Sequence, residues 1–317
     1  DPIVHNESCA TGFRKAGAFQ LGRLYEGLGQ FDQSFNAYQL GKALVKPDWD
    51  PDAHSARVDR LIECWTDSAI ASADIDGSNL VFIVGMMRSG TSLCEQMVSR
   101  CEGIVPGDEL SIVENTVSMF EGTTEYTLPM TREKYTQEQI QSLASKAFDA
   151  YTKHFGDSIG TDKQPENFYH IPLIVRLFPG CKIVHCVRDS MDCCVSNFVQ
   201  SFAHGHPQTH DLGWLGRYHL DYQRVMDAWK SLPEVSMLEI RYEDLVSEPQ
   251  THTKRLAEHI GVPWTEEMLR FHESKRVVKT ASREQVRSAI NTRSIGRHER
   301  FDKHLAPLRS AMGISDS

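Results

Sequence analysis

Short apolar runs separated by helical patterns constrain the fold of this chain more strongly than any other feature of its sequence. The first run, Leu80–Val84, is wholly apolar, and two further runs of strand length lie at 181–187 and 235–240. Amphipathic patterns at 142–154 and 212–230 separate the three runs. Strands that are buried on both faces and alternate with helices are typical of a parallel sheet covered by helices. The sequence therefore predicts an α/β fold.

A glycine-bounded turn joins the first run to a helical stretch at 93–100. Residues 85–92 read Gly-Met-Met-Arg-Ser-Gly-Thr-Ser. Such a turn aims several backbone N–H groups and the positive end of a helix dipole at one spot, and this arrangement binds anions. The hydroxyls of Thr91 and Ser92 add donors, and the guanidinium of Arg88 adds a fixed positive charge. The turn is therefore a candidate anion site.

This turn differs from a Walker A loop in a way that carries chemical information. Thr91 follows Gly90 at the position where a Walker lysine would stand. A kinase, the alternative enzyme on such a core, would need that lysine and Mg²⁺-dependent ATP binding. A transferring sulfuryl group carries one negative charge fewer than a phosphoryl group, so protein donors suffice where phosphoryl transfer uses Mg²⁺. The loop is therefore compatible with sulfuryl transfer, and we expect no metal.

The run at 82–93, Phe-Ile-Val-Gly-Met-Met-Arg-Ser-Gly-Thr-Ser-Leu, resembles the 5′-phosphosulfate loop of PAPS-dependent sulfotransferases. It resembles the bacterial tetratricopeptide-type enzymes and the related tyrosylprotein sulfotransferases more closely than the cytosolic aryl type. The resemblance implies a P-loop-like parallel sheet flanked by helices. It also implies direct in-line transfer of the sulfuryl group of PAPS to a hydroxyl or amine, which leaves PAP. Further elements at matching spacing extend it over residues 80–308, so the joint match is more specific than the loop alone.

The resemblance assigns catalytic roles to three residues. Glu109, in Pro-Gly-Asp-Glu-Leu, takes the position of the general base, and Lys163, in Asp-Lys-Gln-Pro-Glu-Asn, that of the lysine on the bridging oxygen of the phosphosulfate. Arg88 would stabilise the transferring group. A carboxylate is basic enough for this role if the acceptor loses its proton late in a loose transition state. The positive charge of the lysine would offset the negative charge that builds on the leaving phosphate oxygen.

The resemblance also assigns nucleotide contacts. An arginine that leaves a strand and a serine on the next helix hold the 3′-phosphate, and these are Arg188 and Ser196; Tyr242 and Arg297 would contact the nucleotide. The full set expected to bind PAPS is Arg88, Ser89, Gly90, Thr91, Ser92, Arg188, Ser196, Tyr242 and Arg297. Gly296 stands where tyrosylprotein relatives have a serine, which argues against a specific tyrosylprotein activity. The segment 280–287 resembles a basic segment that closes over the cofactor.

Each of these residues also has an ordinary structural interpretation. Glu109 could cap a helix, Lys163 could be a solvated surface lysine, and Arg188 with Ser196 could lie at a strand end and on a solvated helix face. The ordered spacing of the elements favours the functional interpretation. The histidines of the run at 203–210 lack an acid or cysteine that would complete a metal site.

The N-terminal part of the chain has a helical pattern of its own. Apolar residues at 16–45 predict two helices broken at Gly29, and the pattern resembles one tetratricopeptide repeat. A plain helical hairpin is the alternative. One repeat cannot bury its own faces, so it docks on the main domain or ends an array, and it offers a surface for protein contacts. We expect a helical hairpin at 1–50 and a sulfotransferase domain at 51–317.

Composition excludes several partners. The net charge of −9 argues against nucleic acid or an anionic membrane surface as partner, and no apolar stretch reaches the length of a membrane span. Eight cysteines without zinc-type pairs suggest a reducing compartment, so we expect the cytoplasm. Because the chain begins at Asp1 rather than Met, we expect that an upstream segment has been removed.

The acceptor is not encoded in any pattern of the sequence. It could be a small molecule, a carbohydrate or a peptide. A second alternative to an active sulfotransferase is a catalytically silent nucleotide-binding protein in which the helical segment mediates protein interactions. That alternative predicts PAP binding without turnover.

Overall fold

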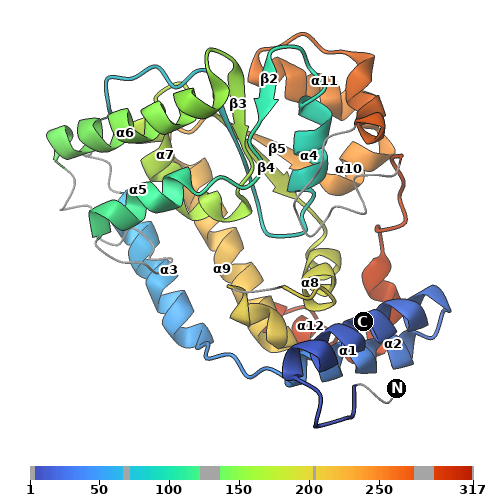
Figure 1. The fold of residues 1–317 in the computed structure, drawn as a ribbon. Helices are drawn as coiled ribbons and strands as arrows, with labels where there is room; N and C mark the ends of the chain where they lie inside the picture. The colour runs from blue at the N-terminus through green and yellow to red at the C-terminus, as the bar shows by residue number, and fades with distance from the viewer. Residues whose placement is uncertain (1–3, 67–71, 122–135, 203–204, 275–288, 316–317) are drawn as a thin grey trace. The chain divides into compact units, whose positions relative to one another are not determined.

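The computed structural model describes residues 4–66, 72–121, 136–202, 205–274 and 289–315 (Figure 1). The chain packs into two compact units. The first comprises residues 1–55, 189–222 and 293–317, and the second comprises residues 56–188 and 223–292. The domain boundary expected at residues 50 and 51 remains a proposal.

The second unit is built on a five-stranded parallel sheet with the order β2-β3-β1-β4-β5. The strands are β1 (Leu80–Val84), β2 (Ile104–Pro106), β3 (Ile159–Asp162), β4 (Lys182–Val187) and β5 (Met237–Arg241). All four neighbouring pairs are parallel, so the chain returns through helices between them. The central strand β1 is buried at every position, which explains its wholly apolar sequence. The predicted α/β fold is confirmed.

Helices cover both faces of this sheet (Figure 1). Val81 and Ile83 of β1 pack into a core with residues of the helices on one face. Phe82 points to the other face, where its ring contacts those of Tyr151 and Phe178. The second unit contains α3 (Pro51–Thr66) from Ala56 onward, α4 (Thr91–Val98), α5 (Ile112–Glu121), α6 (Gln137–Phe155), α7 (Ile171–Leu177), α10 (Tyr242–Ser247) and α11 (Pro249–Ile260), with 3₁₀ turns η2 (Pro165–His170) and η4 (Glu266–Glu273). Successive side chains of β1 therefore pack against helices on opposite faces of the sheet.

The first unit is helical. It contains α1 (Thr11–Gly27), α2 (Phe31–Ala43), α8 (Ser190–Phe198), η3 (Pro207–His210), the start of α9 (Leu212–Lys230), η6 (Arg297–His304) and α12 (Ala306–Met312). A side chain at Gly22 would lie 2.5 Å from the Tyr38 ring, so glycine allows α1 and α2 to approach closely. The ring of Phe35 on α2 stacks on Phe198 of α8 at 5.4 Å. The N-terminal hairpin is thus packed together with segments from later in the chain.

The sequence located the long elements better than the short ones. Two N-terminal helices flank Gly29, as expected, and the run at 80–84 and the pattern at 212–230 match β1 and α9. A further helix, α3, begins at Pro51 and ends at Thr66, and residues 67–71 lie outside the described part of the chain. The resemblance of the hairpin to a tetratricopeptide repeat remains a prediction. None of the helices in the described ranges combines the length and apolar character that a membrane span requires.

Candidate functional site

The turn after β1 has a backbone that only glycine can adopt at its two ends. Gly85 and Gly90 have φ angles of +151° and +107°. A side chain at Gly85 would collide with the carbonyl oxygen of Cys186, and one at Gly90 would lie 2.9 Å from the Tyr242 ring. The N–H of Gly85 donates to the carbonyl of Pro165 at 3.3 Å. The turn is therefore pressed between β4, the start of α10 and the segment after β3.

The donors of this turn are gathered at the start of α4. The helix begins at Thr91, directly after Gly90, so the N–H groups of its first turn and the positive end of its dipole lie at the turn. Ser89, Thr91 and Ser92 are buried, with exposed fractions of 1%, 5% and 6%. The buried hydroxyl of Ser89 has no hydrogen-bond partner among the described residues. A buried hydroxyl without a described partner, beside the start of a helix, fits an anionic ligand.

Arg188 and Tyr242 lie against the same turn. The Arg188 guanidinium is 4.8 Å from the centre of the Tyr242 ring, and its Nη1 donates to the carbonyl of Arg88 at 3.3 Å. Because the Tyr242 ring also touches Gly90, the end of β4 and the start of α10 meet at the turn. Four residues that the sequence placed around one nucleotide, Arg88, Gly90, Arg188 and Tyr242, are neighbours in the second unit.

Lys163 and Glu109 form an ion pair at the end of β3. The Nζ of Lys163 is 2.7 Å from Oε1 of Glu109, with side-chain exposures of 0% and 44%. Two backbone hydrogen bonds of 2.8 Å, from Gly107 N to Thr161 O and from Lys163 N to Asp108 O, fix the loop that carries Glu109 beside the strand end. The lysine is thus fully enclosed, whereas the carboxylate remains accessible to an incoming molecule.

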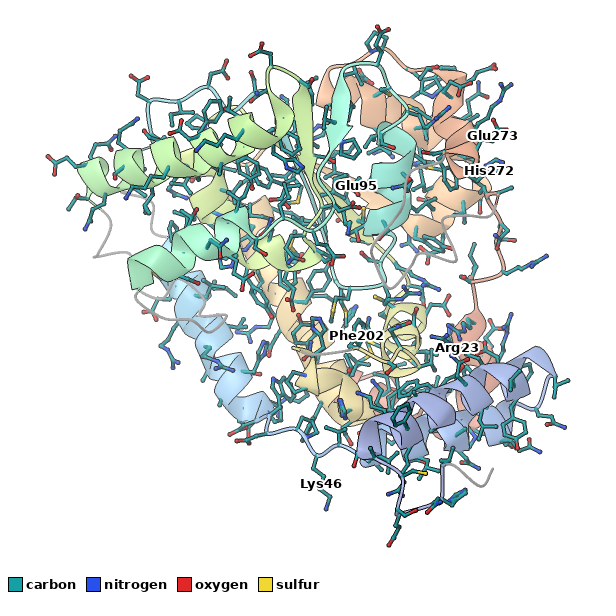
Figure 2. The ribbon with its side chains drawn as sticks, in the orientation of Figure 1. Arg23, Lys46, Glu95, Phe202, His272 and Glu273 are labelled. Atoms are coloured by element: carbon teal, nitrogen blue, oxygen red, sulfur yellow. The ribbon has the colours of Figure 1, made fainter. Side chains whose placement is uncertain are left out.

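Glu95 is a supporting residue that the sequence analysis missed. It lies on α4 with an exposed fraction of 1%, and Figure 2 labels it. Its Oε1 accepts hydrogen bonds from Asp108 N at 3.0 Å and from Thr161 Oγ1 at 2.9 Å. The carboxylate therefore braces both the loop before Glu109 and the strand before Lys163. One feature of the sequence could have identified it: an acid stands inside the short apolar helix after the turn. A carboxylate that is buried in such a helix requires hydrogen-bond partners.

Two further acids near the ion pair have raised pKa values. Burial raises the pKa of Asp162 to about 7, although the hydrogen bond from Tyr151 Oη, at 2.5 Å, opposes the shift. Desolvation raises the pKa of Glu166 to about 7, and the charges of Glu114 and Glu109 add to the effect. Burial therefore favours the neutral form of both carboxyl groups.

The remaining predicted residues belong to the first unit. Ser196 lies on α8 with an exposed fraction of 1%. Arg297 opens η6, and its Nε and Nη2 donate to the carboxylate of Glu26 at 2.8 and 2.6 Å. The segment 280–287 lies outside the described residues. The structure therefore divides the predicted set, with Ser196 and Arg297 in one unit and the others in the second.

The chain is similar to several known proteins. A family model described as the sulfotransferase family matches residues 80–266. An uncharacterized protein of Aquifex aeolicus is 29% identical over 323 residues, which cover 97% of this chain and 42% of that protein. Protein-tyrosine sulfotransferase A of Caenorhabditis elegans is 23% identical over 198 residues, which cover 61% of this chain and 52% of that protein. The chain thus spans about half the length of these relatives, or less.

A solved structure was also matched. The sulfotransferase domain of the Synechococcus PCC 7002 olefin synthase aligns with a TM-score of 0.46 and 17% identity, over 75% of this chain and 98% of that domain.

Proposed function

This chain belongs to the sulfotransferase family, whose model matches residues 80–266 of its 317, and from that premise we propose that it transfers the sulfuryl group of PAPS to a hydroxyl or amine of an acceptor. The observation that carries the proposal is the arrangement at the carboxyl ends of the parallel strands. There the anion-binding turn meets Arg188, and the segment after Lys163 is hydrogen-bonded to Gly85. Ligands of open α/β sheets bind at this edge.

The proposed role of the turn is to hold the 5′-phosphosulfate. The N–H groups at the start of α4, the hydroxyls of Ser89, Thr91 and Ser92 and the guanidinium of Arg88 would donate to its oxygens. Arg188 and Ser196 would hold the 3′-phosphate, and Tyr242 and Arg297 would contact the rest of the nucleotide. The packing of Tyr242 against Gly90 and Arg188 supports its assignment.

The proposed chemistry uses the Lys163–Glu109 pair. Glu109 would accept the proton of the acceptor as its oxygen or nitrogen bonds to sulfur. At the same time the bond between sulfur and the bridging oxygen breaks, and Lys163 would donate to that oxygen as negative charge builds on PAP. Arg88 and the backbone N–H groups would stabilise the transferring group. The exposed carboxylate of Glu109 suits the role of base, because the base must meet an acceptor.

We also propose the setting of the reaction. The acceptor would be a small molecule, a carbohydrate or a peptide, and the helical hairpin offers a surface for protein contacts. All eight cysteines are free, which supports a reducing compartment such as the cytoplasm.

The proposal is tested with labelled PAPS and mixed acceptor pools, with products identified by mass spectrometry. Glu109→Ala should lower turnover by about 100-fold or more while PAP affinity, measured by calorimetry, is retained. Arg188→Ala should weaken PAP binding by about tenfold or more, since it removes a charged partner of a phosphate. The matched controls are Glu102→Ala and Arg241→Ala, which remove exposed side chains of the same types.

Other outcomes would favour the alternatives. Full turnover in Glu109→Ala would remove that residue from the base role, and absence of PAP affinity in the unmodified protein would end the proposal. Normal PAP affinity without turnover on any acceptor would favour a silent nucleotide-binding protein. Mg²⁺-dependent binding of ATP in place of PAP would favour a kinase.

A further inference from the structure

The backbone on both sides of Arg297 is held by a single buried carboxylate. Asp192, on α8, accepts the N–H of Gly296 at 2.7 Å and the N–H of His298 at 2.9 Å. The Nδ1 of His298 is a further 2.9 Å contact of the same carboxylate, whose side chain is 1% exposed. Asp192 precedes Ser196 by one helical turn. The helix that carries Ser196 thus also fixes the segment that carries Arg297.

The side chain of Arg297 is held separately, by the N-terminal hairpin. Its Nε and Nη2 engage both oxygens of Glu26 on α1, at 2.8 and 2.6 Å, and the two side chains are 17% and 11% exposed. Tyr38 Oη and Arg300 Nη1 complete the surroundings of the carboxylate, each at 3.2 Å. Desolvation raises the pKa of Glu26, but the hydrogen bonds and charges of Arg297, Tyr38 and Arg300 together hold that pKa below its ordinary value. This bidentate pair fixes the plane of the guanidinium.

The acids around His298 also resemble a metal-binding group. One ligand atom from each of Asp189, Asp192 and His298 lies within 4.8 Å of the others. However, both oxygens of Asp192 already accept backbone N–H groups, which a cation would displace. The cluster is therefore explained as a hydrogen-bonded clamp on the backbone.

We propose that Glu26 and Asp192 are positioning residues for nucleotide binding. The inference rests on the proposed function, because it takes Ser196 and Arg297 as contacts to PAPS. Glu26 occupies Nε and Nη2 of the guanidinium, which leaves Nη1 able to donate to an anionic ligand. Fixing the group in advance lowers the entropy lost when the ligand binds. The N-terminal hairpin then supplies the residue that holds Arg297, one of the proposed nucleotide contacts.

The test compares two substitutions on the hairpin in the full chain. Glu26→Gln removes the charge that holds Arg297. Asp32→Asn is the matched control, because Asp32 also links the hairpin to η6, through Lys303 and His304, without touching residues 296–298. We expect PAP affinity to fall about tenfold in Glu26→Gln and less than twofold in Asp32→Asn, both measured by calorimetry below the melting transition of each variant.

A double-mutant cycle separates positioning from general stability. Arg297→Ala should weaken PAP binding by itself, and adding Glu26→Gln to it should have no further effect, because the residue being positioned is gone. Asp192→Asn should likewise weaken PAP binding in the unmodified background and have no further effect in Arg297→Ala. If Asp192→Asn does not fold, the cycle with Glu26→Gln alone tests the proposal. Additive losses would overturn the proposal and assign Glu26 a merely structural role.

Three other results have defined meanings. Equal losses in Glu26→Gln and Asp32→Asn would overturn the inference, and so would tighter PAP binding in Glu26→Gln, which would make Glu26 a competitor of the nucleotide. If the unmodified protein binds PAP and Arg188→Ala weakens it while Glu26→Gln has no effect, this inference fails alone. If the unmodified protein does not bind PAP, the proposed function fails and this inference fails with it.

Discussion

Two lysines are buried in the described part of the protein, one in each unit, and their surroundings differ. Lys163, in the second unit, places its ammonium 2.7 Å from the carboxylate of Glu109. Lys42, on α2 in the first unit, donates to Gln200 O and Thr209 Oγ1, each at 3.1 Å. Its ammonium also lies 5.6 to 6.0 Å from three aromatic rings, those of Phe19, Phe198 and Phe202, the last labelled in Figure 2. No carboxylate pairs with Lys42 within the described ranges.

The missing acid changes what the lysine can do. Burial, with a smaller effect from the charge of Lys15, lowers the pKa of Lys42 to about 7, so this side chain exchanges its proton near neutrality. Lys163 instead has a partner that is 44% exposed and can meet a substrate. Burial alone therefore does not identify a catalytic lysine. An acidic partner and access for a ligand distinguish the two sites.

The largest expected difference is in turnover. Lys163→Met should lower the rate of sulfuryl transfer by about 10³, close to 4 kcal/mol of barrier, because the leaving oxygen loses its charged donor. Lys42→Met, the same substitution at the other buried lysine, should leave turnover within about threefold. Both are measured as kcat with saturating PAPS. Equal losses of kcat in the two variants would show that both substitutions act through folding and that Lys163 has no special role in the chemistry.

The sequence predicted those parts of the fold and site that depend on neighbouring residues. The turn at 85–92 joins a wholly apolar strand to a helix, and both signals are local. By contrast, β2 has three residues, and β3 contains Gly160 and Asp162, so neither shows an apolar run. Their strand pairing is decided by contacts with distant segments.

The supporting acids could not be predicted for a related reason. Glu26 pairs with a residue 271 positions away, and Asp192 with residues 104 and 106 positions away. Glu95 reaches a strand 66 positions later. Acids on helices usually lie on solvated faces, and nothing local marks Glu26 or Asp192 as a partner of distant residues. Only the folded chain shows which donors they meet.

The second difference concerns stability, and Glu109→Gln should make Lys163 resemble Lys42. This change leaves a fully buried ammonium without its counter-ion, which costs several kcal/mol in a closed site. Because Glu109 is 44% exposed and water can partly replace it, we expect about 1 to 2 kcal/mol. Urea denaturation at neutral pH measures the loss.

Adding Lys163→Met to Glu109→Gln is the control, since removal of the unpaired charge should recover most of the stability. If Glu109→Gln alone unfolds at the same urea concentration as the unmodified protein, the ion pair makes no net contribution to folding.

The remaining expected difference is the pH dependence of stability that Lys42 causes. Its pKa is about 7 in the folded protein and 10.5 ordinarily, so between these values the unfolded chain holds a proton that the folded chain has lost. Stability should therefore rise with pH across this window. Lys42→Met should remove that rise, while changing stability at pH 7 by less than about 1 kcal/mol, because methionine fills similar space among the aromatic rings.

Melting temperatures between roughly pH 7 and pH 10 measure this effect, as the difference between the variant and the unmodified protein. The difference isolates Lys42 from other groups that titrate in the same range, such as cysteines. Lys146→Met, at an exposed position on α6, is the matched control and should keep the rise. A rise that persists unchanged in Lys42→Met would mean that Lys42 keeps its proton throughout, held by its carbonyl, hydroxyl and aromatic contacts as firmly as an acid would hold it. The two lysines would then be alike in charge, and only the access of Glu109 to a substrate would distinguish them.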